Sequence, residues 1–224
     1  MNPVLITAAT RWAADPLAKA LGLPASGDGR WEGLACGRRI LLLKTGMGAI
    51  KTHERLERDC MAGDHGLVIS AGLCGALQPG IKTGDIVADA QEVEVDYAAT
   101  LKGTAEALGL PFHFGKILHT NLVLKPGMKR KLGTENRALA CDMETAAVRR
   151  WACGKTPVIG LRVVLDELDE VAPPEAPESE GAVALVRYAL AHTDELPLLI
   201  RTGLRSARGM KSLSLLLKAC LEAM

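Results

Sequence analysis

The chain has 224 residues, of which 48% are hydrophobic and 3% aromatic, and its formal net charge at pH 7 is +1. This length fits one domain with a sizeable core, which must be largely aliphatic. The scarcity of aromatic side chains and the balanced charge argue against a nucleic-acid partner, because single strands are bound by aromatic stacking along a basic groove.

Short apolar runs alternate with glycine turns and helical patterns, which is typical of an α/β sheet. Val4–Thr7 predicts the first strand. Asp15 and Pro16 predict the cap and the first position of a helix that ends at Gly22, since proline is favoured at the first helical position. Residues 8–14 are then expected to form a loop.

The strand and turn pattern recurs further along the chain. A strand is predicted at Ile40–Lys44, and the turn Thr45–Gly48 follows it. A helix should then run from about Ala49 to Ala62 and end at Gly63, because glycine commonly terminates helices.

Glycine-rich turns follow two more predicted strands. Leu67–Ala71 is expected to end in the loop Gly72–Gly75, and Gly84-Asp85 opens a strand at Ile86–Ala88. Such turns let backbone N–H groups approach an anion, since glycine has no Cβ to hold a phosphate or sugar at a distance. A single turn is equally consistent with simple chain reversal, so the argument depends on several turns at equivalent strand ends.

Two carboxylates, those of Glu144 and Asp166, carry the strongest chemical signal. Asp142 and Glu144 lie where a helix should begin, and Asp166 ends the continuous apolar run Val158–Leu165. One carboxylate could hold sugar hydroxyls while the other, partly desolvated, protonates a leaving group, which is the chemistry of cleaving a glycosidic bond. Both also have structural interpretations, because Glu144 can complement the helix dipole and Asp166 can form a cap or turn.

Other kinds of site lack support in the sequence. The six cysteines include no Cys-x-x-Cys pair and the five histidines no i, i+4 pair, so no metal site is expected. Dinucleotide, Walker and Gly-x-Ser-x-Gly motifs are missing. The basic cluster Lys125–Lys131 is expected to be a solvated face. Without a signal-peptide pattern or a run of roughly 20 apolar residues, the protein is expected to be cytoplasmic.

Four stretches, in order, resemble the nucleoside phosphorylase and nucleosidase superfamily, which includes purine nucleoside phosphorylases, uridine phosphorylase and methylthioadenosine/adenosylhomocysteine nucleosidase. They are Thr45–Gly48, Ala71–Leu77 with Gly84–Val87, Asp142–Ala147 and Arg162–Asp166. The resemblance implies one domain over residues 1–224, with a mixed central sheet flanked by helices. It also implies a homo-oligomer, and no cofactor is expected.

The resemblance assigns roles to individual residues. Asp166 would be the general acid to the purine N7, Glu144 would bind ribose hydroxyls, and Met143 would pack on the sugar. Ala71, Gly72 and Leu165 would bind the base. Asp166 can protonate the purine only if its pKa is raised toward the working pH, which burial would favour.

The loop after the first strand departs from the nucleosidase branch, which places a water-activating glutamate there. This chain has Ala9–Trp12, including Arg11, and an arginine suits an anion better than it suits deprotonating water. We therefore expect phosphate to be the nucleophile, with Arg11 as its main ligand. Supporting ligands would be Thr7, Thr45, Gly46 and Ser70. The phosphorylase branch, however, has a serine and an arginine in the third glycine turn, where this chain has Ser70 and Leu73. Arg11 could also be an ordinary surface cation.

The tail adds a further resemblance. After an exposed Pro/Glu-rich connector at 173–180, a basic helical extension is predicted at 195–222. Its arginines and its apolar stripe repeat at helical spacing: Arg201, Arg205 and Arg208, then Leu213, Leu216, Leu217 and Cys220. Such a helix could rest on a membrane surface, or pack on its own domain or a twin subunit.

This tail and the apolar Leu73 most resemble the hopanoid-associated phosphorylase branch, which cleaves adenine from the lipid adenosylhopane. The sequence therefore predicts a phosphorylase for an adenosine-type nucleoside with a large apolar 5′ group. Hydrolysis of the same bond by water is an alternative, as is a nucleoside-binding protein without turnover.

Overall fold

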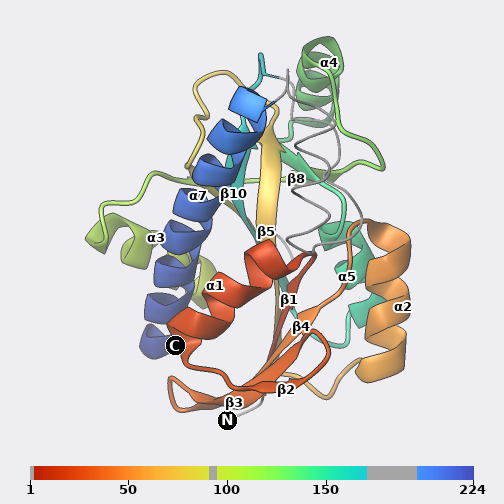
Figure 1. Ribbon diagram of the computed structural model, residues 1–224, viewed down its shortest axis with the longest axis vertical. Coiled ribbons are helices and arrows are strands. Elements are labelled where there is room, and N and C mark those ends of the chain that lie inside the picture. Colours follow the sequence, from red (N-terminus) through yellow and green to blue (C-terminus); the bar gives the residue numbers. More distant parts are fainter. Residues whose placement is uncertain (1–2, 91–94, 171–195) are drawn as a thin grey trace.

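The computed structural model describes residues 3–90, 95–170 and 196–224. The connector 173–180 and residue 195 lie outside the described residues. One mixed, ten-stranded sheet runs through the molecule between helical layers (Figure 1). The predicted α/β fold, a mixed central sheet flanked by helices, is therefore confirmed.

The central strands of this sheet are parallel and the outer ones are mixed. The order is β2-β3-β4-β1-β5-β10-β6-β7, with β9 pairing with the end of β5 and with β8. The strands are β1 Val4–Ala8, β2 Ala25–Gly27, β3 Arg30–Ala35, β4 Arg38–Lys44, β5 Leu67–Ala76, β6 Ile86–Asp89, β7 Phe112–Phe114, β8 Ile117–His119, β9 Ala140–Asp142 and β10 Val158–Asp166. Because β4, β1, β5 and β10 are parallel neighbours, their carboxyl ends meet at one edge, where open α/β sheets bind ligands.

Helices cover both faces of the sheet (Figure 1). Those described are α1 Arg11–Leu21, α2 Ala49–Asp59, α3 Val95–Ala107, α4 Pro126–Asn136, α5 Thr145–Ala152 and α7 Leu196–Ala223. The largest apolar cluster packs α1, α3 and α7 on one face, and a second cluster packs α2 and α5 on the other. This arrangement leaves the carboxyl edge of the parallel strands between the layers.

The first helix begins earlier than predicted. It starts at Arg11, because the hydroxyl of Thr10 accepts a hydrogen bond from the Ala13 N–H and caps it, so residues 11–14 are not loop. Pro16 lies inside the helix, where its missing N–H leaves the carbonyl of the exposed Trp12 to water. The predicted end at Gly22 is confirmed by its left-handed φ of 65°.

The predicted loop Gly72–Gly75 is wrong, because β5 continues through it to Ala76. Gly72 pairs with Arg162 and Gly75 with Asp166 on β10. A Cβ on Gly72 would lie 2.7 Å from Nη1 of Arg162, so this glycine makes room for a buried side chain and does not turn the chain. The α2 helix also ends sooner than predicted, at Asp59.

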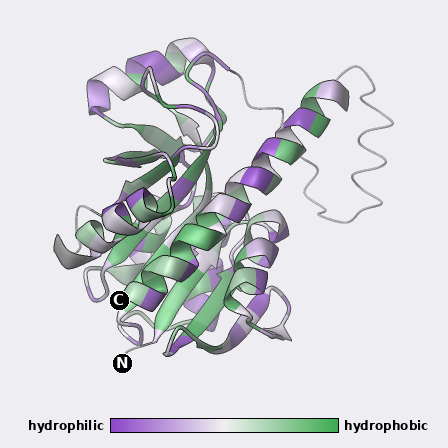
Figure 2. Cartoon of the chain, turned by 90° about the vertical axis from the view of Figure 1, so that its left-hand side faces the viewer, coloured by the Kyte–Doolittle hydropathy of each residue, from purple (hydrophilic) through white to green (hydrophobic). Residues whose placement is uncertain are grey.

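The C-terminal helix α7 is part of the core. Its predicted apolar stripe is buried in the largest apolar cluster, together with Met210 and Leu221. Figure 2 shows the hydrophobic half of α7 lying over the domain and the more hydrophilic half toward its amino-terminal end. Packing on its own domain thus accounts for the stripe. In the described part of the chain, no helix is long and apolar enough to span a membrane.

Two glycines of α7 provide a matched test of this packing. A Cβ at Gly209 would lie 2.9 Å from Cγ2 of Val163 on β10, whereas one at Gly203 would meet nothing within 4 Å. We expect Gly209→Ala to lower the free energy of unfolding by about 1–3 kcal/mol through overpacking. Gly203→Ala should raise it by about 0.5–1 kcal/mol, because alanine loses less backbone entropy in a helix. Urea denaturation measures both, and equal shifts would contradict the close packing of α7.

Candidate active site

The turns after β1 and β4 lie side by side at the carboxyl edge of the sheet. The Thr45 N–H donates to the Ala8 carbonyl at 2.9 Å and the Gly46 N–H to the Ala9 carbonyl at 3.0 Å. From this turn the Gly48 N–H, whose residue has a φ of 88°, donates to Oε1 of Glu144 at 2.9 Å. Two of the predicted site motifs are thereby brought into contact.

Met143 lies next to the same turn. Its Cε is 4.0 Å from the position of a Cβ on Gly48, so both predicted ribose ligands, Met143 and Glu144, lie against the Thr45–Gly48 turn. Glu144 is the residue before α5, and its side chain points to the turn without capping the helix. Asp142 caps α5 instead, accepting from the Thr145 N–H at 3.1 Å.

Arg162 joins this region to the middle of the sheet. Its side chain is 2% exposed, although its neighbours on β10 from Val158 to Leu165 are apolar. Nε donates to Oδ2 of Asp142 at 2.6 Å, and Nη2 donates to the hydroxyls of Ser70 at 2.8 Å and Thr145 at 3.1 Å. Oε2 of Glu144 lies 3.7 Å from Nη2. Arg162 thus contacts β5, β9 and α5 at once.

The electrostatics of Glu144 follow from this packing. Burial raises the pKa of the Glu144 carboxyl, while Arg162 and the Gly48 N–H stabilise its charged form. A carboxylate held in this way can accept hydrogen bonds from hydroxyl groups, because each of its oxygens has two lone pairs. The charged form of Glu144 therefore depends on Arg162.

Asp166 lies at the end of β10, against Gly75 and near Cys141. A Cβ added to Gly75 would lie 3.1 Å from Oδ2 of Asp166 and 3.4 Å from Sγ of Cys141, so both side chains pack against this glycine. Asp166 is 7% exposed, and burial raises the pKa of its carboxyl, as the sequence predicted. The ion pair with Lys129 opposes that shift.

The expectation that the basic cluster Lys125–Lys131 is solvated is wrong for Lys129. Its side chain is 1% exposed, and its Nζ donates to Oδ2 of Asp166 and to the carbonyls of Glu167 at 2.7 Å and Glu170 at 2.9 Å. Its neighbour Lys131, in contrast, is exposed as expected. The difference arises because α4 packs closely on the end of β5, where a Cβ on Gly133 would lie 2.2 Å from the Leu77 carbonyl oxygen.

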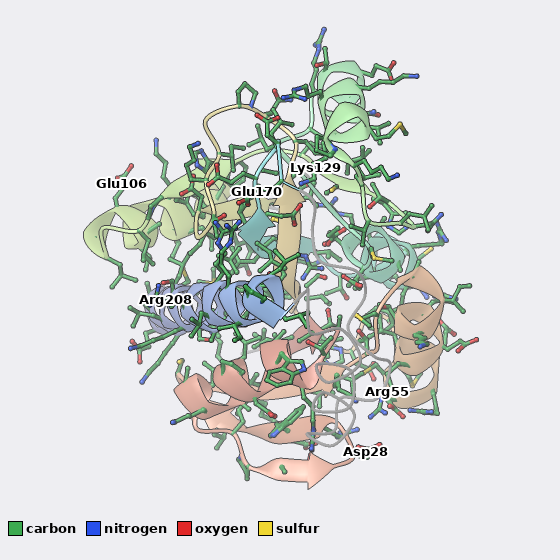
Figure 3. The ribbon with its side chains drawn as sticks, turned by 45° about the horizontal axis from the view of Figure 1, so that its top comes forward. Asp28, Arg55, Glu106, Lys129, Glu170 and Arg208 are labelled. Atoms are coloured by element: carbon green, nitrogen blue, oxygen red, sulfur yellow. The ribbon has the colours of Figure 1, made fainter. Side chains whose placement is uncertain are left out.

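The segment after Asp166 is held from several sides. Glu170 pairs with Arg201 at 2.6 Å and with Arg205 at 2.8 Å on α7, and Glu167 pairs with Lys82 at 3.0 Å. Figure 3 shows Lys129 and Glu170 close together. Two arginines of the predicted basic extension therefore bind the loop that follows the candidate acid.

The predicted phosphate ligands fall into two groups. Thr7 and Ser70 are buried on neighbouring strands, and the Ser70 hydroxyl accepts from Arg162. Thr45 is buried as well, in the turn after β4, where its hydroxyl donates to the carbonyl of Gly46 at 3.2 Å. Arg11, in contrast, is exposed at the start of α1.

A hollow of about 280 Å³ opens beside Thr45 and Gly46, and neither Glu144 nor Asp166 lines it. Its charged lining is Asp28, Lys44, Lys51, Glu54, Arg55 and Arg58. Arg55 donates to the Asp28 carbonyl at 2.7 Å, and the two lie together in Figure 3, away from Lys129. Four cations and two carboxylates line the hollow, and two of the cations, Arg55 and Arg58, also pair with Asp59, so its excess of positive charge is small.

The three predicted base ligands also differ in exposure. Ala71 is fully buried in the core cluster, and Gly72 is buried beneath Arg162. Leu165 is half-buried beside Asp166. Of the three residues, Leu165 is the one with surface left for a ligand.

Sequence reasoning assigned no role to Arg162 and Lys129. Arg162 carried a usable signal, because an arginine within a buried strand must have a partner. Lys129 carried none, since it lies among three other basic residues in Lys125–Lys131.

Comparison with known proteins finds no matching protein-family model and no matching curated protein. Solved structures match along the whole chain. Futalosine hydrolase of Helicobacter pylori strain 26695 matches with a TM-score of 0.73 at 17% identity, over 100% of this chain and 98% of its own. The 5′-methylthioadenosine/S-adenosylhomocysteine nucleosidase of Neisseria meningitidis, in complex with methylthio-immucillin-A, matches at 0.71 and 17%, over 100% of both chains. The Campylobacter jejuni nucleosidase of the same name matches at 0.73 and 14%, also over 100% of both. This protein therefore has the fold of these enzymes.

Removing Arg162 tests how far the site depends on it. Arg162→Met would leave Asp142 buried without its cation, so we expect the free energy of unfolding to fall by roughly 3–5 kcal/mol. Arg39→Met is the matched control, because Arg39 is 74% exposed and lies 3.7 Å from Glu32, a pair worth about 1 kcal/mol or less. Similar losses in the two variants, measured by urea denaturation, would contradict the central role of Arg162.

Proposed function

We propose that the protein cleaves the N-glycosidic bond of an adenosine-type nucleoside, with phosphate as the nucleophile. The observation that carries the proposal is a pair of carboxylates at one edge of the sheet, the buried Asp166 and the mostly buried Glu144, in a fold that futalosine hydrolase and methylthioadenosine nucleosidases share. Burial raises the pKa of both carboxyls, which suits Asp166 as an acid, and Arg162 and the Gly48 N–H stabilise the charged form of Glu144, which suits a ligand for hydroxyls.

The two groups would act on opposite sides of the breaking bond. As the C–N bond lengthens, its electron pair moves to the purine and positive charge develops on the ribose. Asp166 would donate its proton to the purine N7, so that the base leaves neutral. Glu144, held by Gly48 and Arg162, would bind the ribose hydroxyls and stabilise the developing positive charge, with Met143 packing on the sugar.

Phosphate is preferred to water because cations gather around the turn that contacts Glu144. Arg11 begins α1 directly after β1, where helix N-terminal N–H groups also favour an anion. The small excess of positive charge around the hollow beside Thr45 and Gly46 supports the same preference. Attack by phosphate would give a sugar phosphate, whereas attack by water, the alternative, would give the free sugar.

A large apolar 5′ group, such as the hopane of adenosylhopane, is the finer part of the proposal. It is supported by exposed apolar side chains on the amino-terminal half of α7, where Ile200 is 56% and Leu204 53% exposed. These lie among the basic residues that suit a peripheral membrane contact. Adenosylhopane in detergent should then be cleaved with a higher kcat/KM than adenosine.

The reaction is tested by adenine release from adenosine, 5′-methylthioadenosine and adenosylhopane, with and without phosphate. We expect release that requires phosphate, and a loss of about 10²- to 10⁴-fold in kcat for Asp166→Asn, because a general acid contributes about that much. Asp169→Asn is the matched control, since Asp169 is 68% exposed on the same segment. Release without phosphate would make the protein a nucleosidase. Full activity in Asp166→Asn would exclude the acid role, and nucleoside binding without release would indicate a binding protein.

The phosphate ligand is tested separately. Arg11→Met should raise the KM for phosphate at least about tenfold and leave the KM for the nucleoside nearly unchanged, because a charge-assisted bond to an ion contributes about 1.5–3 kcal/mol. Lys19→Met, on the exposed side of the same helix, should change neither constant. An unchanged phosphate KM in Arg11→Met would identify Arg11 as an ordinary surface cation.

A further inference from the structure

We propose that Lys129 is a positioning residue for the candidate general acid: its ammonium group binds Oδ2 of Asp166, leaves Oδ1 to carry the proton, and stabilises the carboxylate that remains after transfer. The inference rests on the proposed function, which gives Asp166 its role.

The geometry makes Lys129 a fixed partner of Asp166. Lys129 is 1% exposed, and its Nζ donates to three acceptors, which are Oδ2 of Asp166 and the carbonyls of Glu167 and Glu170. An ammonium group has three N–H donors, so these three acceptors use all of them. The ammonium group is therefore held in place by the backbone as well as by the carboxylate.

This arrangement distinguishes the two oxygens of Asp166. Oδ2 accepts a hydrogen bond from the Lys129 ammonium group. A proton on Oδ2 would therefore lie close to the N–H hydrogen that Lys129 donates, and the two would repel each other. The proton is more stable on Oδ1. When the C–N bond breaks, its electron pair goes to the purine, the proton moves from Oδ1 to the purine nitrogen, and the negative charge left on Asp166 faces the Lys129 ammonium.

Two opposing effects then set the strength of the acid. Burial raises the pKa of the Asp166 carboxyl, which keeps it protonated at higher pH. Lys129 limits this rise, which keeps Asp166 acidic enough to donate. The other titratable groups that face Asp166 are Glu170, which raises its pKa, and the Cys74 and Cys141 thiols. Burial raises the pKa of Cys141 to about 11 and also raises that of Cys74 well above its usual value, so both thiols are neutral at working pH.

The test is the pH dependence of kcat/KM in Lys129→Met and Lys129→Gln. The reaction needs protonated Asp166, so activity falls as pH rises through its pKa. Without the ammonium charge this alkaline limb should move to higher pH by at least about one unit, because a nearby opposite charge shifts a carboxyl group by that much or more. The kcat should fall more than KM changes. A limb that stays in place would overturn the proposal.

Two further variants, Lys129→Arg and Lys131→Met, separate charge from packing. Lys129→Arg keeps the charge, so its limb should stay near that of the wild type even where activity falls. Lys129→Gln keeps a donor for the loop carbonyls, so it carries the test should Lys129→Met fail to fold. Lys131→Met removes an exposed lysine from the same helix and should leave the profile unchanged.

A measurement without turnover distinguishes failure of this inference from failure of the proposed function. The Asp166 carboxyl can be titrated by ¹³C NMR, with its signal assigned by its loss in Asp166→Asn. If the wild type cleaves no nucleoside, the proposed function fails, yet an upward move of this titration in Lys129→Gln still supports control of Asp166 by Lys129. An identical titration in wild type and Lys129→Gln would overturn the inference whatever the activity.

Discussion

The site depends on the charge compensation of Arg162. A guanidinium group within a strand that is buried on both faces needs partners, because an unpaired charge in the interior is very costly. The partners come from three elements: Ser70 on β5, Asp142 at the end of β9 and Thr145 at the start of α5. Meeting this need fixes where α5 begins, and so where Glu144 points. The ribose ligand of the proposed reaction is thus positioned by an ion pair that would itself never touch the substrate.

A second buried pair, Lys129 with Asp166, solves a different problem at the same edge. A general acid must lose its proton during each turnover, so its two protonation states must lie close in free energy at working pH. Burial alone would stabilise only the neutral form, and an opposite charge alone would stabilise only the ionised one. At Asp166 both effects act together. They also act together at Glu144, where burial raises the pKa of the carboxyl while Arg162 and the Gly48 N–H stabilise its charged form. The two carboxylates differ in their partners, because Asp166 pairs with Lys129 whereas Glu144 lies against the Thr45–Gly48 turn.

The sequence predicted the strands of the parallel core, and it predicted Asp166 at a strand end and Glu144 at a helix start, because these are local patterns. It failed where a residue's role depends on a distant neighbour. Gly72 was read as a turn residue, but it is a strand glycine that makes room for Arg162, 90 residues later in the chain. Pro16 favours a helix start at its own position, but the cap at Thr10 begins the helix five residues earlier, at Arg11. Lys129 looked solvated, and only the close packing of α4 on Leu77 buries it.

The C-terminal helix connects stability to the proposed chemistry. Its buried half packs on Val163 of β10, three residues before the candidate acid, and its basic half binds Glu170, four residues after it. Exposed ion pairs of this kind add little stability on their own. Here they act on a segment whose backbone carbonyls, those of Glu167 and Glu170, also bind Lys129. A change at Arg201 or Arg205 would therefore reach Asp166 through the position of Lys129, so α7 contributes to the geometry of the acid without contacting it.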